Sequence, residues 1–196
     1  MLVWAVVVAA AACSSPREPI ANRSATSSVQ TPADPLPFVK GATFVYDVTI
    51  AFHDATTGQD ATAQFPWTMT VVDVHEGRIR ISGWLQQLVD FDAKTPYTPP
   101  APAVRELVRT DDSVSLHGEH WLSLPLADGQ RTCPDAKSRY CWVVSADHER
   151  FRVAFVTGPD DETFELTPGV GVSRFDYHHH GTTLDVSAKL VSHPGR

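Results

Sequence analysis

The chain has 196 residues, of which 42% are hydrophobic, and its formal net charge is −7 at pH 7. This length is enough for one domain with a sizeable hydrophobic core. The acidic balance argues against a nucleic-acid partner, because phosphate binding needs a basic surface, and it offers no polybasic attachment to anionic lipid.

Residues 1–12 are predicted to be a signal peptide. An uninterrupted apolar run ends in small residues and is followed by Cys13 and a polar stretch. The run is too short for a transmembrane helix, which needs about 20 apolar residues. A buried core helix is the other alternative, but the polar residues that follow at once argue against it. The segment Ala10-Ala11-Ala12-Cys13 resembles the lipobox of bacterial lipoproteins.

The resemblance to bacterial lipoproteins implies a cellular location and a lipid anchor. In that family the signal is cut before the cysteine and the thiol carries a diacylglycerol, which makes Cys13 the expected lipidation site. Two or more acyl chains hold a protein stably on a membrane. An Asp after the cysteine favours inner-membrane retention in this family, and here Ser14 takes that place. We therefore expect a lipid-anchored protein of the cell envelope, on the outer membrane and facing the periplasm.

Residues 13–37 are predicted to form the lipid anchor and a disordered tether. The segment is rich in Ser, Thr, Ala and Pro and has few large apolar side chains. It therefore cannot bury enough surface to offset its ordering entropy. Its prolines stiffen and extend it. A single β domain is expected over residues 38–196.

Beyond residue 38 the hydrophobic pattern has a period of two, which indicates half-buried strands. The alternation covers residues 43–53, 62–71, 79–81, 104–110, 113–117, 151–155 and 184–190. About ten short strands with short connections predict an all-β fold, in which an antiparallel meander curls into a barrel or half-barrel. A two-sheet sandwich is the alternative. No window predicts an amphipathic helix of useful length, and the proline-rich run 95–102 is predicted to be an exposed loop.

Cys133 and Cys141 remain an even pair once Cys13 is assigned to the lipid. An exported protein works in an oxidising compartment, which favours a disulfide between them. A bridge that closes so short a loop contributes about 2–3 kcal/mol of stability in the chain-entropy model. A metal pair is the alternative, but zinc cysteines usually lie closer in sequence and come with two further ligands.

The most distinctive motif lies near the C-terminus. It consists of a Pro-Gly-Val-Gly run at residues 168–171, an aromatic strand and a His-Gly-Thr turn at residues 180–182. This stretch resembles the closing hairpin of uncharacterised all-β envelope lipoproteins, which also tend to open with a Gly, aromatic and Tyr strand like residues 41–47. The resemblance implies an envelope protein and brings no known activity with it.

The consecutive histidines at residues 178–180 suggest a metal site, because neutral imidazole is the commonest metal ligand. In a strand, however, His178 and His180 point to one face and the middle ring to the other. At most two rings can then reach one ion, and further ligands such as His53 or His120 would have to be recruited. We predict no tight metal site here, with His178 and His180 as the candidate ligands if one exists.

The sequence contains no recognised enzyme signature. It has no Gly-x-Ser-x-Gly elbow, phosphate-binding loop or dinucleotide fingerprint, and the acidic residues 160–162 are predicted to form a turn. We therefore expect a binding or structural role without a cofactor. A periplasmic metal-binding protein and an unrecognised hydrolase are the alternatives. Under the binding hypothesis, the concave face of the sheet holds an apolar ligand or a segment of another envelope protein. The candidate lining residues are Phe65, Trp67, Trp84 and Phe155.

Overall fold

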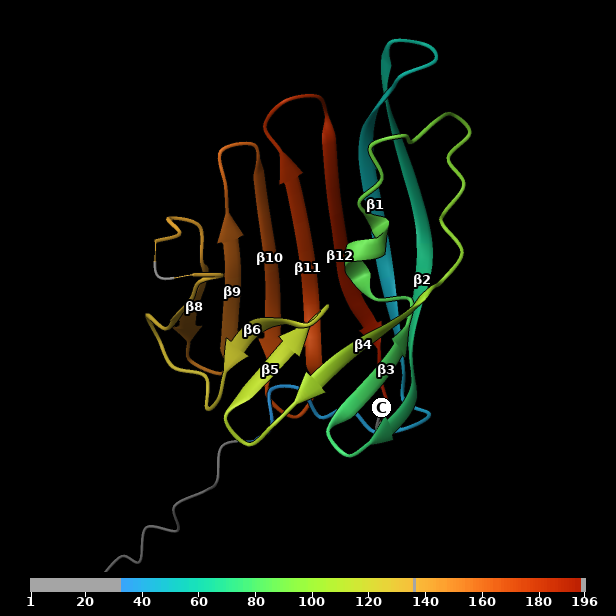
Figure 1. The fold of residues 1–196 in the computed structure, drawn as a ribbon. Helices are drawn as coiled ribbons and strands as arrows, with labels where there is room; N and C mark the ends of the chain where they lie inside the picture. The colour runs from blue at the N-terminus through green and yellow to red at the C-terminus, as the bar shows by residue number, and fades with distance from the viewer. Residues whose placement is uncertain (1–32, 136, 195–196) are drawn as a thin grey trace, which may run out of the picture. The chain divides into compact units, whose positions relative to one another are not determined.

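The alternating segments pair into one antiparallel sheet in the computed structural model, which describes residues 33–135 and 137–194. Among these residues the sheet has twelve strands in the order β6-β5-β4-β3-β2-β1-β12-β11-β10-β9-β8-β7. It curls into a nearly closed barrel with an open seam between β6 and β7 (Figure 1). The predicted all-β meander and its curved barrel are confirmed. The predicted signal peptide, Cys13 and most of the predicted tether lie outside the described residues.

The regular structure of the described residues consists of these strands and one short 3-10 helix, η1. Their bounds are β1 Thr43–Asp54, β2 Gln59–His75, β3 Arg78–Ser82, η1 Leu85–Leu88, β4 Val104–Arg109, β5 Ser113–Leu116, β6 Glu119–Ser123, β7 Arg131–Thr132, β8 Trp142–Asp147, β9 Arg150–Val156, β10 Asp160–Thr167, β11 Gly171–His179 and β12 Leu184–Ser192. The alternation pattern identifies seven of these strands but does not predict β6, β7, β8 or β10. No helix in the described part of the chain is long and apolar enough to cross a membrane.

The first and last strands of the chain pair in the middle of the sheet. The seam lies between the two edge strands, which come from the middle of the sequence. β1 pairs with β12, with Val48 opposite Ala188, so the first and last strands are neighbours. The two edge strands β6 and β7 are consecutive in sequence but share no ladder. Gln130 Nε2 donates a hydrogen bond to the Ser123 carbonyl, 2.8 Å away, and so bridges the seam through a side chain.

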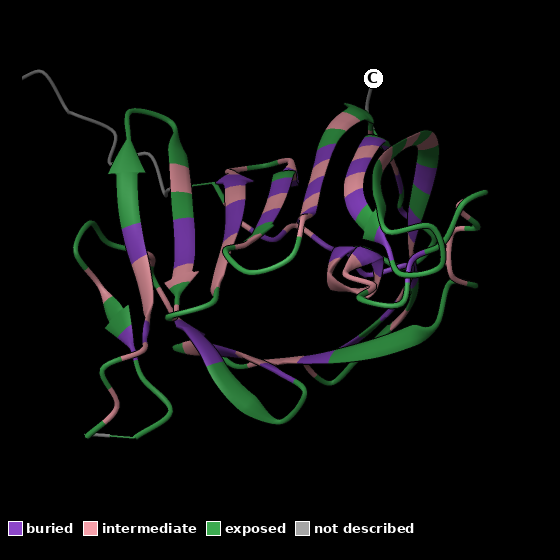
Figure 2. Ribbon diagram, turned by 90° about the horizontal axis from the view of Figure 1, so that it is seen from above, coloured by how far each residue is buried: buried purple, intermediate pink, exposed green. Residues whose placement is uncertain are grey.

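Inward-facing side chains fill most of the barrel. Buried and exposed residues alternate along the strands, as the colours in Figure 2 show. The ring of Trp121 on β6 lies 5.1 Å from that of Phe164 on β10, and Phe175 on β11 follows at 4.9 Å. Trp84 stacks on Phe164 at 5.7 Å between ring centroids. These contacts tie the strands on the two sides of the barrel together, so the concave face is a packed core and not a wide apolar groove.

The segment before β1 belongs to the body, which corrects the predicted tether boundary. Arg109 Nη1 on β4 lies 2.6 Å from the Asp34 carboxylate and 3.1 Å from the Leu36 carbonyl. Leu36 and Phe38 are both buried. The tether was expected to extend to residue 37 because the segment has few large apolar residues. Leu36 and Phe38 are enough, however, to cover one end of the barrel, where the N-terminal segment crosses beneath the strands (Figure 1).

The long connection from β3 to β4 occupies the opposite end. It contains η1, whose Leu85 and Leu88 are fully buried. Tyr97, within the proline-rich run, packs against Phe52 and Phe65 at 5.5 and 5.6 Å between ring centroids. The run is a loop, as predicted, but its Tyr97 side chain is half-buried and attaches the loop to β1 and β2.

Candidate functional site

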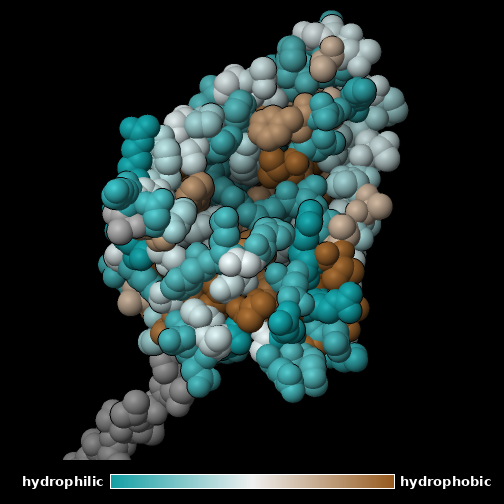
Figure 3. Space-filling view, in the orientation of Figure 1, coloured by the Kyte–Doolittle hydropathy of each residue, from teal (hydrophilic) through white to brown (hydrophobic). Residues whose placement is uncertain are grey.

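A pocket of about 450 Å³ lies at the open seam of the barrel, and we call it the seam pocket. The β5–β6 hairpin, the disulfide loop and the inner faces of β8 to β10 line it. Its lining residues are Gly118, Glu119, His120, Cys133, Pro134, Trp142, Phe155 and Glu162. The face shown in Figure 3 is mostly hydrophilic, with apolar side chains visible in patches between polar ones. The seam leaves the inner face of the sheet accessible at this point.

A single row of side chains crosses four strands, and its first three members form the inner wall of the seam pocket. Trp142 pairs with Phe155, Phe155 with Glu162, and Glu162 with Tyr177 in the antiparallel register of β8 to β11. Residues directly opposite each other point to the same face of a sheet. The ring centroids of Trp142 and Phe155 lie 5.1 Å apart. A carboxyl group is therefore inserted into an otherwise aromatic row.

Glu162 is the ionisable group of this wall. Burial raises its pKa to about 7, the nearby charge of Asp160 adds to the rise, and a hydrogen bond from Gln86 opposes it. Its Oε1 atom is buried and has no hydrogen-bond partner among the described residues. Buried polar atoms are normally paired, so this oxygen is an open position for a hydrogen-bond donor or a cation. Near neutral pH the group can also release or take up a proton.

Asp160, two residues before Glu162, forms hydrogen bonds with two side chains of the neighbouring strand β11. Its Oδ1 atom lies 2.5 Å from the Tyr177 hydroxyl and 2.8 Å from His179 Nδ1. Burial opposes ionisation of Asp160, but the bonds from Tyr177 and His179 outweigh it and hold its pKa below the ordinary value. Burial and the bond to Asp160 raise the pKa of Tyr177. Asp160 therefore stays ionised beside Glu162 and disfavours a second charge there.

The other ring nitrogen of His179 does not face the seam pocket. A Cβ atom added to Gly181 would lie 2.5 Å from His179 Nε2, so the ring is packed against the backbone of the turn. Phe91 covers the same ring edge-on, at 5.2 Å between centroids. An Asp–His pair can orient a general base, but only when the second nitrogen reaches a nucleophile or substrate. Here the Asp160–His179 pair holds the end of β11 and the following turn at Gly181 against β10 instead.

The candidate metal ligands His178 and His180 lie together on the outer face. Their ring centroids are 4.7 Å apart, and the middle residue His179 points inward, as strand geometry predicts. His178 pairs with Asp185, and His180 Nε2 lies 3.1 Å from the Asp161 carboxylate. In the part of the chain that the structure describes, no group of three or more His, Cys, Asp or Glu residues is arranged to hold a metal ion.

The acidic residues 160–162 are not a turn, which corrects the prediction for that segment. They begin β10 and alternate between the two faces of the sheet. Asp160 and Glu162 point inward, whereas Asp161 meets His180 outside. The preceding Gly-Pro pair forms the turn, and the polar residues continue as strand because each finds a partner across the ladder. The sequence signal was the spacing: Glu162 lies two residues before the apolar Phe164, so on a strand the two side chains point to the same face.

Three of the four candidate lining residues belong to the packed interior. Trp67 and Trp84 are buried, with exposed fractions of 4% and 0%, and Phe65 stacks on Tyr97. Phe155 does line the seam pocket. His120, named above as a ligand that a metal site would have to recruit, is on β6 at the pocket rim, with Nε2 3.0 Å from the Leu122 carbonyl.

The predicted cysteine pair is present, since the Sγ atoms of Cys133 and Cys141 lie at disulfide distance, 2.06 Å. Cys133 is also part of the lining of the seam pocket, so the bridge places the disulfide loop at its mouth.

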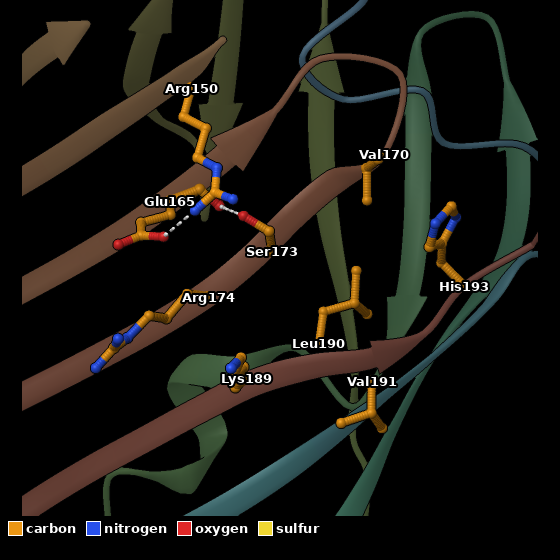
Figure 4. Close-up of a pocket in the computed structure, with 9 residues that line it drawn as sticks. All are labelled: Arg150, Glu165, Val170, Ser173, Arg174, Lys189, Leu190, Val191 and His193. Atoms are coloured by element: carbon orange, nitrogen blue, oxygen red, sulfur yellow. Dashed lines mark hydrogen bonds and ion pairs between the residues drawn. The ribbon is translucent and has the colours of Figure 1, made fainter. Parts of the chain in front are cut away.

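A second hollow, of about 410 Å³, lies on the outer face of β9 to β12 (Figure 4). Three of its four Lys, Arg and Glu side chains have an ion-pair partner among the described residues, and Lys189 has none. Arg150 Nη1 lies 3.8 Å from the Glu165 carboxylate, and Arg174 Nε lies 2.6 Å from that of Asp176. Because most of these charges are already paired and no buried polar side-chain atom of the hollow's described lining lacks a partner, the seam pocket is the stronger candidate site.

The chain matches no protein-family model and no curated protein.

Proposed function

We propose that the protein is a lipid-anchored cell-envelope protein whose β domain binds a small organic cation with an apolar body in the seam pocket. The proposed lipid anchor and the cell-envelope location rest on the lipobox-like segment that ends at Cys13. The binding role rests on one observation, the unpartnered buried oxygen of Glu162 in an aromatic wall.

The charge of the seam pocket favours a cationic ligand. Its lining includes the carboxyl groups of Glu119 and Glu162 and, among the described lining residues, neither Lys nor Arg. An ammonium group at Glu162 would relieve the cost of burying a carboxylate without a partner. Hydrogen bonds that involve a charged group contribute about 1.5–3 kcal/mol.

The aromatic part of the wall suits the rest of such a ligand. Trp142 and Phe155 provide faces on which an apolar ring can stack and over which a cation is attracted. A pocket of about 450 Å³ falls within the usual range for small-molecule sites. The seam leaves a path of entry that does not require the barrel to open.

A titration followed by tryptophan fluorescence tests this proposal. The probe is 2-phenylethylamine, and its uncharged analogue is 2-phenylethanol. The amine should bind the full chain about tenfold or more tightly than the alcohol, and Glu162→Gln should remove that preference. Glu149→Gln, an exposed substitution of the same type, is the matched control and should behave as the wild type. Equal binding of the two probes, or an amine preference that survives in Glu162→Gln, would contradict the proposal, and so would binding of neither probe.

A further inference from the structure

A third hollow, of about 350 Å³, lies on the outer face of β7 to β9 and is lined by Arg131, Arg139 and Arg152. We call it the arginine hollow. Its other described lining residues are apolar or uncharged, with no Asp or Glu among them. Three positive charges therefore gather in one depression of a chain whose net charge is −7.

The strand register explains why the arginines converge. Arg131 on β7 lies opposite Val143 on β8, and Arg152 on β9 lies opposite Ser145, two residues further along the same strand. Residues two apart on a strand share a face, so both guanidinium groups project from the same side. Arg139 comes from the disulfide loop and lies over the ring of Tyr140, 4.9 Å from its centroid.

The disulfide sets the spacing of two of these side chains. Arg131 and Arg139 each lie two residues before a bridged cysteine. Cys141 also lines the hollow. Bridging Cys133 to Cys141 thus keeps the segments that carry Arg131 and Arg139 beside each other. A site that is assembled before its ligand arrives binds more tightly, because less ordering is needed on binding.

Each arginine of the hollow lacks a carboxylate partner, which is true of only some arginines in the described chain. Four arginines form ion pairs, namely Arg78, Arg109, Arg150 and Arg174. Within residues 33–135 and 137–194, Arg80, Arg105, Arg131, Arg139 and Arg152 form none. Three of these five line one hollow.

The carboxylate opposite Arg152 in the ladder already has an ion-pair partner. Glu165 lies opposite Arg152 in the ladder, but its carboxylate faces Arg150 (Figure 4). Arg152 Nη2 donates to the Thr163 hydroxyl, 3.1 Å away, which leaves its positive charge uncompensated. Adjacent like charges repel each other, and a bound anion would remove that repulsion.

We propose that the arginine hollow is a binding site for a phosphate group, separate from the seam pocket and independent of the function proposed for it. The planar guanidinium group matches the oxygens of phosphate with paired hydrogen bonds. Three such groups suit an anion that carries more than one negative charge. The hollow also has room beside the phosphate for a substituent. The same chemistry is offered by free phosphate and by the headgroup of a phospholipid with a terminal phosphate.

Nuclear magnetic resonance of the arginine Nε–Hε groups in the full chain tests the proposal. Inorganic phosphate and dihexanoyl phosphatidic acid are titrated at constant ionic strength, with chloride as the reference anion. Both phosphates should shift the signals of Arg131, Arg139 and Arg152. The double variant Arg131→Gln/Arg152→Gln should weaken binding about tenfold or more. Arg80→Gln/Arg105→Gln is the matched control, because it removes two unpaired strand arginines elsewhere, and it should bind as the wild type.

The two probes distinguish the sources of the phosphate. Tighter binding of the lipid supports a membrane headgroup, whereas equal affinities support a soluble phosphate. Thermal unfolding of both double variants verifies that each is folded. The proposal is overturned if phosphate moves these signals no more than chloride does. It is also overturned if the two double variants bind alike.

Discussion

At Glu162, burial in an aromatic row and the charge of Asp160 both oppose ionisation, and a hydrogen bond from Gln86 does not cancel them. A carboxyl group with an ordinary pKa is charged throughout the neutral range, whereas this one changes its charge there. The same alternation that buries Phe164 turns Glu162, two residues earlier on β10, toward the inside of the barrel, where its Oε1 atom is buried. One inward position on one strand thus determines the chemistry of the seam pocket.

Replacing Glu162 with Gln should change the pH dependence of stability. The folded-state pKa of about 7 lies above the ordinary 4.5. The stability that this group contributes is therefore fully present below pH 4.5 and is lost as the pH rises through 7. Without ligand, Glu162→Gln should be more stable than the wild type by about 3 kcal/mol at pH 8 and nearly equal to it at pH 4. Urea denaturation at both pH values measures the difference, and a gap that does not vary with pH would contradict the assignment.

At the scale of elements, single polar side chains attach the loops to the strands. Asp54 at the end of β1 is fully buried, and its carboxylate accepts hydrogen bonds from the backbone of Thr56, Thr57 and Thr95. It thereby joins the β1–β2 turn to the connection between β3 and β4. The hydrogen bond from the Thr95 side chain and these backbone bonds lower the pKa of Asp54 to about 2.

Asp54→Asn should destabilise the domain at neutral pH, because an amide nitrogen replaces one of the accepting oxygens. The folded-state pKa of about 2 lies below the ordinary 3.8. Its contribution is therefore present above pH 4 and is lost as the pH falls through 2. The difference in thermal midpoint between the wild type and the variant should shrink over that window. Asp111→Asn, in an exposed turn, is the control and should leave the midpoint unchanged. A difference that persists at pH 2 would rule out this role for Asp54.

The disulfide loop is a second element-scale feature. Cys133 and Cys141 should resist alkylation in the purified, unreduced protein, because they are bonded to each other. Replacing both with Ser should lower the free energy of unfolding by about 2–3 kcal/mol, as expected for so short a loop. Mass spectrometry after alkylation and a denaturation curve measure the two effects. Two freely alkylated thiols in the unreduced protein would show that the bridge is absent in solution.

At the scale of the whole molecule, the barrel is covered at both ends and open along one side. The N-terminal segment covers one end, the connection with η1 occupies the other, and the seam opens the side. The seam pocket is lined by two carboxylates, and the arginine hollow on the outer face has three guanidinium groups. The seam pocket has acidic groups and the arginine hollow has basic ones, so the net charge of −7 does not predict the local charge of either site.

The proposed anchor predicts a modified N-terminus. Mass spectrometry of the protein from membrane fractions should show a chain that begins at an acylated Cys13. Cys13→Ser should release the protein from the membrane or leave its signal uncut, since the thiol is the proposed attachment point. An intact Met1 in the wild type, or a free thiol at Cys13 in the membrane-bound protein, would contradict the lipoprotein assignment.

Much of the strand pattern could be predicted from the sequence, and the seam pocket could not. β1 and β12 alternate so regularly that their apolar face is evident, from Phe44 to Phe52 in the first case. β10 was hidden by its polar start, because a run of acidic residues after Gly-Pro has the composition of a turn. β7 has two residues, too few to carry any periodicity. Trp142 and Glu162 become neighbours through Phe155 only when the strands are in register.

The sequence by itself determined the all-β class, the alternating faces of the long strands, the opposite directions of His178 and His179, and the pairing of Cys133 with Cys141. The strand features depend on local spacing, because a strand's period of two applies wherever the strand lies. The cysteine pairing was predicted from the cysteine count and the expected oxidising compartment. The tertiary structure decided where the sheet closes, which segments cover its ends, and how Glu162 and the arginines are surrounded. The pKa of a carboxyl group and the charge balance of a hollow depend on side chains that folding brings together from distant strands, so no local pattern reveals them.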